Sequence, residues 1–109
     1  MNYEVLITDG AERDLEAIHD HLLHSGSKGE ADHVLDRLMA MAESLATFPE
    51  RGSHPKELAS LGILDYRQVY FKPYRTLYRV IGKQVIICLI ADGRREMQTL
   101  LMTRLLANY

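Results

Sequence analysis

The sequence predicts an α+β fold: an N-terminal strand, an antiparallel helical hairpin packed on a mainly antiparallel four-stranded sheet, and a short C-terminal helix. Two apolar stripes of helical period lie in the first half of the chain, and the period changes to two between residues 66 and 92. A stretch containing Pro and Gly separates these regions. With 109 residues, we expect a single domain spanning 1–109, built on one modest core.

The first two elements are a strand and a helix. Tyr3–Thr8 alternates weakly and contains Val-Leu-Ile, which predicts a short strand. Asp9, followed three residues later by Glu12, has the spacing of a capping box, so we expect a helix to begin there. Its apolar residues recur at helical spacing, and the helix should extend to about His24.

The second helix completes a hairpin. Ser-Gly-Ser breaks the first helix, and Ser27 with Glu30 repeats the capping signal. An apolar stripe follows and ends before Pro49; its members are Ala31, Leu35, Leu38, Ala42 and Leu45. Because only a few residues join the two amphipathic helices, they should pack antiparallel.

Three strands and a last helix are expected in the second half. Pro49–Leu64 is mostly loop, with a short helical turn at Pro55–Ala59. The strands are Tyr66–Phe71, Tyr74–Ile81 and Gln84–Asp92, connected by turns at Lys72-Pro73 and Gly82-Lys83. Helical spacing returns at Glu96–Leu106.

Two-residue turns would pair position 71 with 74 and position 81 with 84, which sorts the strand residues into two faces. The more apolar face should receive the helical hairpin; it contains Arg67, Val69, Phe71, Tyr74, Thr76, Tyr78, Val80, Val85, Ile87 and Leu89. The opposite face mixes Tyr, Arg and aliphatic residues, as a surface awaiting a partner would; it contains Tyr66, Gln68, Tyr70, Arg75, Leu77, Arg79, Ile86, Cys88 and Ile90. The last strand is apolar on both faces, so it should be central, with the N-terminal strand on its outer side.

Charge is divided between the two halves of the chain. Residues 1–50 contain eleven Asp/Glu and three Lys/Arg, a balance of −8, whereas residues 51–109 contain four and ten, a balance of +6. Such sorting indicates a cationic surface that faces a partner. No apolar run is long enough for a membrane helix, no secretion signal is visible, and the single cysteine is typical of a reducing cytoplasm.

The basic residues of the second half suggest two partners. Those on or beside the predicted strands are Lys56, Arg67, Lys72, Arg75, Arg79, Lys83, Arg94 and Arg95. Arginine forks bind phosphate and tyrosines stack on bases, so nucleic acid is one partner, and an acidic protein segment is the other. Alternatively, these residues are simply solvated or pair internally with acidic residues of the helices. The pI of about 6.2 argues against strong binding of nucleic acid.

Arg94-Arg95 is unusual because the pair begins a helix. Cations at a helix N-terminus are unfavourable by about 0.3–1 kcal/mol each, so folding alone would not select them. The same helix end attracts anions, and two arginines beside it could form an anion or carboxylate site. A structural ion pair is the alternative interpretation.

Other reactive residues give weaker signals. His19, His21 and His24 cluster on the first helix but lack cysteine neighbours, which disfavours a metal site. His54 could act as a general base, although exposure in a loop explains it equally well. Cys88, in the central strand, is expected to be a core thiol. No nucleotide-binding or nucleophile motif is present, and no cofactor or metal is expected.

Several segments together resemble the RelE/ParE superfamily of bacterial toxins. They are Leu45–Gly52, Tyr66-Arg67, Tyr74–Val80 and Asp92–Arg95, in this order and spacing, and the resemblance covers nearly the whole chain. It implies a small cytoplasmic toxin of a type II toxin–antitoxin module, a class linked to plasmid stabilisation and stress. A cognate antitoxin with an acidic or amphipathic tail would hold it inactive, and operator DNA would be bound only through the antitoxin. A toxin dimer or a heterotetramer with antitoxin is compatible with this.

The resemblance leaves the target open. The RelE branch cleaves messenger RNA on the ribosome, and Lys56, Arg67 and Arg94 or Arg95 match its basic elements. It usually has a Tyr or His near the C-terminus, and here only Tyr109 is available. The ParE branch, whose members inhibit DNA gyrase by binding and are not enzymes, is therefore favoured. A non-toxic member that only binds antitoxin is a third possibility. The aliphatic C-terminal helix would pack on the open sheet face or be buried by another chain, and the residues expected to contact partner or target are Arg67, Tyr70, Arg75, Arg79, Arg94, Arg95, Leu101 and Leu105.

Overall fold

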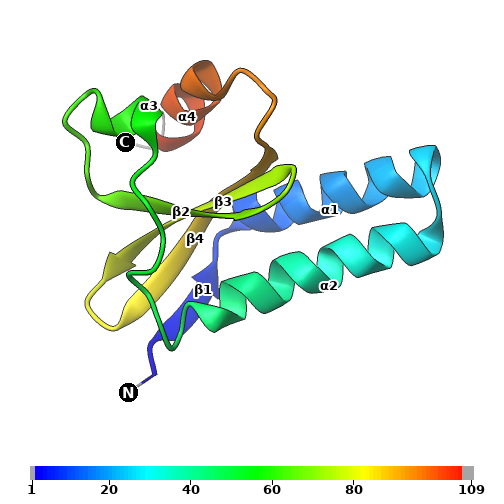
Figure 1. Cartoon of the computed structure of the whole chain (residues 1–109), viewed down its shortest axis with the longest axis horizontal. Helices are drawn as coiled ribbons and strands as arrows, with labels where there is room; N and C mark the ends of the chain where they lie inside the picture. Colours follow the sequence, from blue (N-terminus) through cyan, green and yellow to red (C-terminus); the bar gives the residue numbers. More distant parts are fainter. Residues whose placement is uncertain (1, 107–109) are drawn as a thin grey trace.

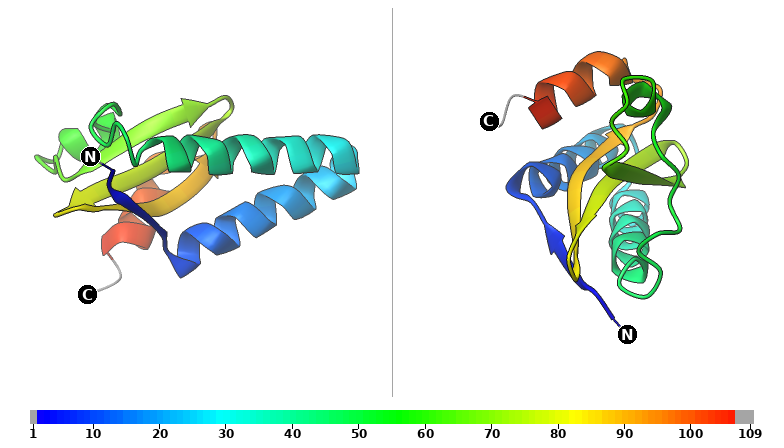
Figure 2. Two further views of the ribbon diagram at one scale, coloured as in Figure 1. Left: turned by 90° about the horizontal axis from the view of Figure 1, so that it is seen from below. Right: turned by 90° about the vertical axis from the view of Figure 1, so that its left-hand side faces the viewer.

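The computed structural model describes residues 2–106 and has the predicted α+β architecture (Figure 1). In chain order its elements are β1 (Glu4–Ile7), α1 (Asp9–Ser25), α2 (Lys28–Ser44), α3 (Lys56–Ala59), β2 (Tyr66–Phe71), β3 (Tyr74–Ile81), β4 (Gln84–Asp92) and α4 (Met97–Leu106). The last three strands have the bounds that period-two alternation predicted. The helical hairpin projects beyond the sheet (Figure 1), and α2 and α4 lie apart from each other in both views of Figure 2.

The two long helices begin at side-chain caps. Ser27 caps α2 as predicted, since its hydroxyl accepts a hydrogen bond from the Glu30 amide at 3.1 Å. The expected cap of α1 at Asp9 is wrong by one residue. Thr8 is the cap: its hydroxyl accepts from the Ala11 amide at 3.2 Å and donates to the Ile87 carbonyl at 3.0 Å. The second bond couples the start of α1 to β4, which local spacing does not indicate.

The sheet has the order β1-β4-β3-β2, so the apolar strand β4 is central and β1 lies on its outer side, as predicted. β1 runs parallel to β4, and the other neighbours are antiparallel. The expected turn registers are confirmed, with Phe71 opposite Tyr74 and Ile81 opposite Gln84. Gly82 has a φ of 58°, a left-handed conformation that glycine adopts without strain in such a turn.

A bulge in β4 changes part of the predicted face assignment. Leu77 lies opposite Leu89, but the next residue, Tyr78, lies opposite Ile87, which leaves Cys88 without a partner in the ladder. One extra residue reverses the side-chain alternation beyond it. Leu89 therefore faces away from the hairpin and Ile90 packs against it, the reverse of the prediction.

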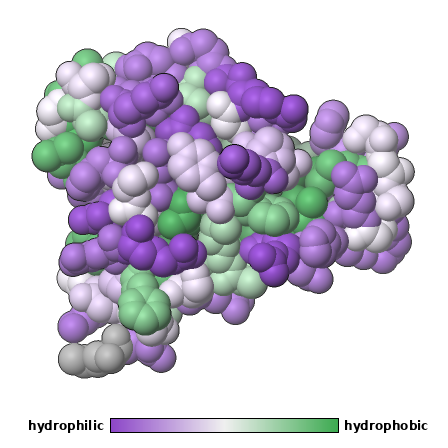
Figure 3. Space-filling model, viewed as in Figure 1, coloured by the Kyte–Doolittle hydropathy of each residue, from purple (hydrophilic) through white to green (hydrophobic). Residues whose placement is uncertain are grey.

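Two apolar clusters cover opposite faces of the sheet. The larger joins the hairpin to its face of the sheet; its buried members include Ala11, Leu15, Leu38, Leu45, Val69, Tyr78, Val85 and Ile87. The smaller lies under α3 and α4 and consists of Leu58, Leu77, Leu89, Ala91, Met97 and Leu101. The second face is thus largely covered by the chain itself, and α4 packs on the sheet, one of the two placements left open by the sequence. Figure 3 shows the view of Figure 1 as mostly hydrophilic, with an apolar strip between the sheet and the hairpin.

Candidate partner and target interface

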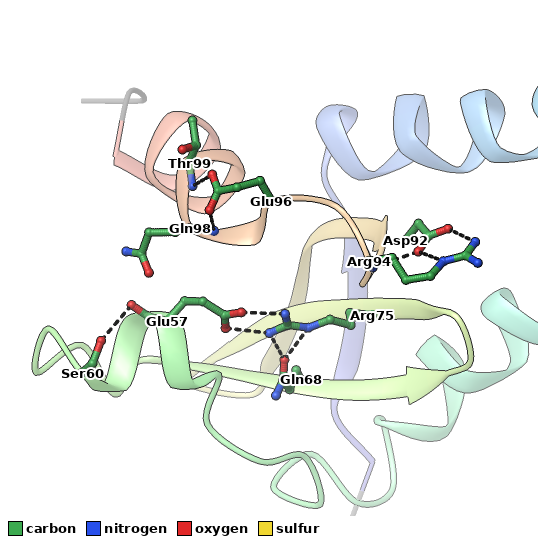
Figure 4. Close-up of polar contacts among 9 residues, drawn as sticks. All are labelled: Glu57, Ser60, Gln68, Arg75, Asp92, Arg94, Glu96, Gln98 and Thr99. Carbon is green, nitrogen blue, oxygen red and sulfur yellow. Dashed lines mark hydrogen bonds and ion pairs between the residues drawn. The ribbon is translucent and has the colours of Figure 1, made fainter.

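Arg75 is the second residue of β3, on the sheet face that α3 and α4 cover, where it is 5% exposed (Figure 4). Its two terminal nitrogens each donate to a carboxylate oxygen of Glu57 at 2.9 Å, and its Nε donates to Gln68 Oε1 at 2.9 Å. The hydrogen bond from Arg75 holds the pKa of Glu57 below its ordinary value. This guanidinium, expected on a partner-binding surface, is instead buried and paired within the chain.

Gly93 provides the space that Arg75 occupies. A Cβ at this position would lie 2.9 Å from Arg75 Cδ and 3.1 Å from Cγ, closer than carbon atoms pack. The Gly93 amide also donates to the Pro73 carbonyl at 2.8 Å, which joins the end of β4 to the β2–β3 turn. Glycine at position 93 is therefore explained by the Arg75 side chain of β3, which fills the space that a Cβ would need.

Arg94 turns back onto Asp92. Its backbone amide and Nε donate to Asp92 Oδ1 at 2.9 and 3.0 Å, and Nη2 donates to Oδ2 at 2.6 Å. These hydrogen bonds lower the pKa of Asp92 to about 2. The Arg94 side chain is nevertheless 78% exposed, so the pair forms at the surface, where a partner could reach it.

The helix end that was expected to attract an external anion already holds an internal one. The Glu96 carboxylate accepts from the backbone amides of Gln98 at 3.1 Å and Thr99 at 2.8 Å, which lowers its pKa. Arg95 is exposed, and among residues 2–106 its side chain has no hydrogen-bond or ion-pair partner. The two arginines thus differ: Arg94 is paired with a carboxylate, whereas Arg95 is exposed and lines a shallow groove along α4.

The remaining predicted contacts divide into exposed and half-buried positions. Lys56, the first residue of α3, is exposed, and Tyr70 is 53% exposed on the edge strand β2. Arg67 is half-buried and donates to the carbonyls of Glu50 at 3.1 Å and Gly52 at 2.8 Å, so it stabilises the loop before α3. Arg79 is also half-buried, with its guanidinium over the Tyr66 ring.

The two aliphatic residues predicted on α4 contribute to the core. Leu101 is fully buried, and Leu105 is half-buried against the cluster beneath α4. Tyr109 lies outside the described residues. The sequence signals therefore did not separate surface groups from groups buried within the domain.

His19, His54 and Cys88 have partners within the chain. His19 Nε2 lies 2.8 Å from Asp32 Oδ1 across the hairpin, and His54 Nδ1 lies 3.1 Å from the Tyr66 carbonyl. Burial raises the pKa of the Cys88 thiol to about 11. Within residues 2–106, no three His, Cys, Asp or Glu side chains are grouped to hold a metal, and no helix is long and apolar enough to cross a membrane.

A family model described as the ParE toxin of the type II toxin–antitoxin system parDE matches residues 5–98. The chain belongs to the ParE toxin family. It is thus a type II toxin by family, within the RelE/ParE superfamily that its motifs resemble. A search of curated proteins found no match.

Solved structures of this superfamily have the same fold. The chromosomal ParDE system from P. aeruginosa matches with a TM-score of 0.70 and 22% identity, covering 83% of this chain and 95% of that one. The RelBE2 toxin–antitoxin complex from Mycobacterium tuberculosis matches with a TM-score of 0.63 and 21% identity, covering 84% and 99%. A mutant of the E. coli toxin RelE in the free state matches with a TM-score of 0.61 and 15% identity, covering 91% and 92%. At these identities the likeness concerns the fold.

Proposed function

We propose that this ParE-family toxin acts in the cytoplasm by binding and inhibiting DNA gyrase, and that a cognate antitoxin neutralises it. The observation that carries the proposal is the internal pairing of the basic face. Glu57 neutralises Arg75, Asp92 neutralises Arg94, and Glu96 occupies the amides at the start of α4. Of the basic elements that a RelE-like nuclease would use, Arg94 is paired with Asp92, and Arg67 donates to the carbonyls of Glu50 and Gly52.

This face has few of the groups that RNA cleavage requires. Phosphoryl transfer needs positive charge directed at the phosphate and a group that moves a proton. Among the described residues, the face around Arg75 offers Lys56 and Arg95 as exposed cations without a carboxylate partner, because Glu57 and Asp92 pair with Arg75 and Arg94. So few unpaired cations favour a protein target over messenger RNA.

A protein partner is well matched to what remains exposed. Tyr70, Arg94 and Arg95 lie at the surface, and Tyr and Arg are the residues most enriched in the energetic centres of interfaces. An acidic antitoxin tail would exchange Asp92 for its own carboxylates at Arg94 and pair with Arg95. In this scheme operator DNA is contacted only through the antitoxin, which would contribute the DNA-binding part of the module.

Induced expression in cells tests the proposal, with purified gyrase as the direct assay. We expect filamentation, DNA-damage signalling and broken DNA with messenger RNA intact, together with inhibition of supercoiling by the purified toxin. Rapid codon-linked cleavage of messenger RNA would contradict the proposal and favour an endoribonuclease. Normal growth and unaffected supercoiling would instead indicate a family member that only binds antitoxin.

A further inference from the structure

A second basic region lies at the opposite end of α4 from Arg94 and Arg95. It is a cleft of about 830 Å³ between the start of α1, the C-terminal half of α4 and the sheet. Three arginines line it, Arg13, Arg79 and Arg104, together with the Tyr66 ring and two leucines of α4. This volume lies in the range that holds a small ligand or a few residues of a peptide.

The three arginines have different environments. Arg104 is committed to the domain, because its terminal nitrogens donate to both carboxylate oxygens of Asp14 at 2.9 and 2.8 Å. Arg13 is exposed at the rim, where Asp9 contributes one opposing charge. Arg79, from β3, is half-buried, with its guanidinium carbon 5.3 Å from the centroid of the Tyr66 ring.

Arg79 carries the strongest indication of a ligand. Its Nε is buried and has no hydrogen-bond partner within the part of the chain that the structure describes. A buried N–H without an acceptor is destabilising, and unsatisfied groups of this kind are rare in folded proteins. Nε itself is closed to solvent, so an oxyanion that enters the cleft would pair with the remaining part of the guanidinium and supply its countercharge.

The walls favour a peptide over a nucleic acid. Leu100 and Leu105 line one side of the cleft, where a phosphate chain would find no partner and an apolar side chain would be buried. The Asp9 carboxylate at the rim and the pI of about 6.2 also disfavour a polyanion. A single carboxylate beside an apolar residue matches both the charge and the walls.

We propose that this cleft is a docking site for a short partner segment in which an acidic side chain reaches Arg79 and Arg13 and a neighbouring apolar side chain packs on Leu100 and Leu105. The assignment of this segment to the antitoxin rests on the function proposed above, whereas the site itself is inferred from the residues that line the cleft. It would add a second contact for the antitoxin, at the end of α4 opposite Arg94 and Arg95.

The experiment uses the full chain and a fluorescein-labelled peptide of alternating Glu and Leu, followed by fluorescence anisotropy. Arg79→Met keeps an apolar stem over Tyr66 and removes the guanidinium, and Arg13→Glu reverses a charge at the rim. We expect both to weaken binding at least about tenfold. Lys72→Glu makes the same charge reversal at an exposed turn outside the cleft, and binding should change less than about twofold.

Two further measurements, the melting temperature of Arg79→Met and the alkylation rate of Cys88, distinguish binding in the cleft from an effect on folding. Arg79→Met should melt no lower than the parent, because it removes an unpaired buried donor. Cys88, the only cysteine of the chain, lines the cleft, so bound peptide should slow its alkylation by iodoacetamide; the reaction is followed at alkaline pH because the pKa of this thiol is raised to about 11. Equal binding by Arg13→Glu and the parent, or unprotected Cys88, would overturn the proposal, as would stronger protection by oligouridine. Retained peptide binding by a protein that leaves gyrase unaffected would refute the proposed function alone.

Discussion

Replacing Glu57 with glutamine tests whether the Arg75 pair stabilises the domain. The Glu57 and Arg75 side chains are 12% and 7% exposed, so Glu57→Gln leaves a guanidinium in a nearly dry site without its countercharge. Removing one partner of a buried pair typically costs about 3–5 kcal/mol. Gln68 Oε1 still accepts from Arg75, and the new amide retains one acceptor, so we expect a loss of about 2–3 kcal/mol. The melting temperature should fall by about 10 °C.

The assay is urea unfolding followed by circular dichroism at neutral pH, with Asp92→Asn at the exposed Arg94 pair as the matched control. The control should lose clearly less stability, because exposed ion pairs contribute little. The pKa of Glu57 is held below its ordinary value of 4.5, so its stabilising contribution is present above that pH and is lost as the pH falls through the lowered pKa. The difference between parent and variant should therefore narrow in acid.

A double variant separates pairing from packing. Glu57→Leu with Arg75→Met replaces both charges with apolar groups, and such replacements of buried pairs are often neutral or stabilising. The double variant should thus be more stable than Glu57→Gln. If Glu57→Gln unfolds at the same urea concentration as the parent, Arg75 must have solvent or another partner available, and the argument that it is withdrawn from the surface fails.

Three further predictions concern the same face and its supporting loop. Gly93→Ala places a Cβ 2.9 Å from Arg75 Cδ and should destabilise the fold by about 1–3 kcal/mol in thermal melts, whereas a loss below about 0.5 kcal/mol would show that Arg75 moves aside freely. Tyr78→Phe removes a buried hydroxyl that donates to one loop carbonyl at 2.7 Å and accepts from one loop amide at 3.0 Å; urea unfolding should show a loss of about 1–3 kcal/mol, and an unchanged midpoint would refute this role. Arg94→Ala with Arg95→Ala should retain the parent circular dichroism spectrum and melting curve but lose about tenfold in antitoxin affinity by calorimetry or in toxicity by growth. Unchanged affinity and toxicity would rule out the role of these arginines.

Local patterns were sufficient for the elements of this fold. The period-two strands and the two-residue turns depend on neighbours within a few positions, and their bounds and registers agree with the structure. The face assignment failed only in β4 after Cys88, the extra residue of the bulge, where Leu89 and Ile90 exchange faces. Nothing in the alternation of β4 indicates this extra residue, because β4 is apolar on both faces.

The candidate functional face could not be predicted from residue spacing alone, because it depends on contacts between elements that are distant in the sequence. The sequence by itself determined a cationic second half, the motif around Arg94-Arg95 and the resemblance to a toxin family. Only the tertiary structure decided which charges remain available: Glu57 meets Arg75 across 18 positions and Asp14 meets Arg104 across 90. Periodicity reports which side of an element a residue occupies, whereas pairing of charges depends on which elements pack together. The physical difference is between interactions set within one turn or hairpin and interactions that exist only once α3 and α4 lie on the sheet.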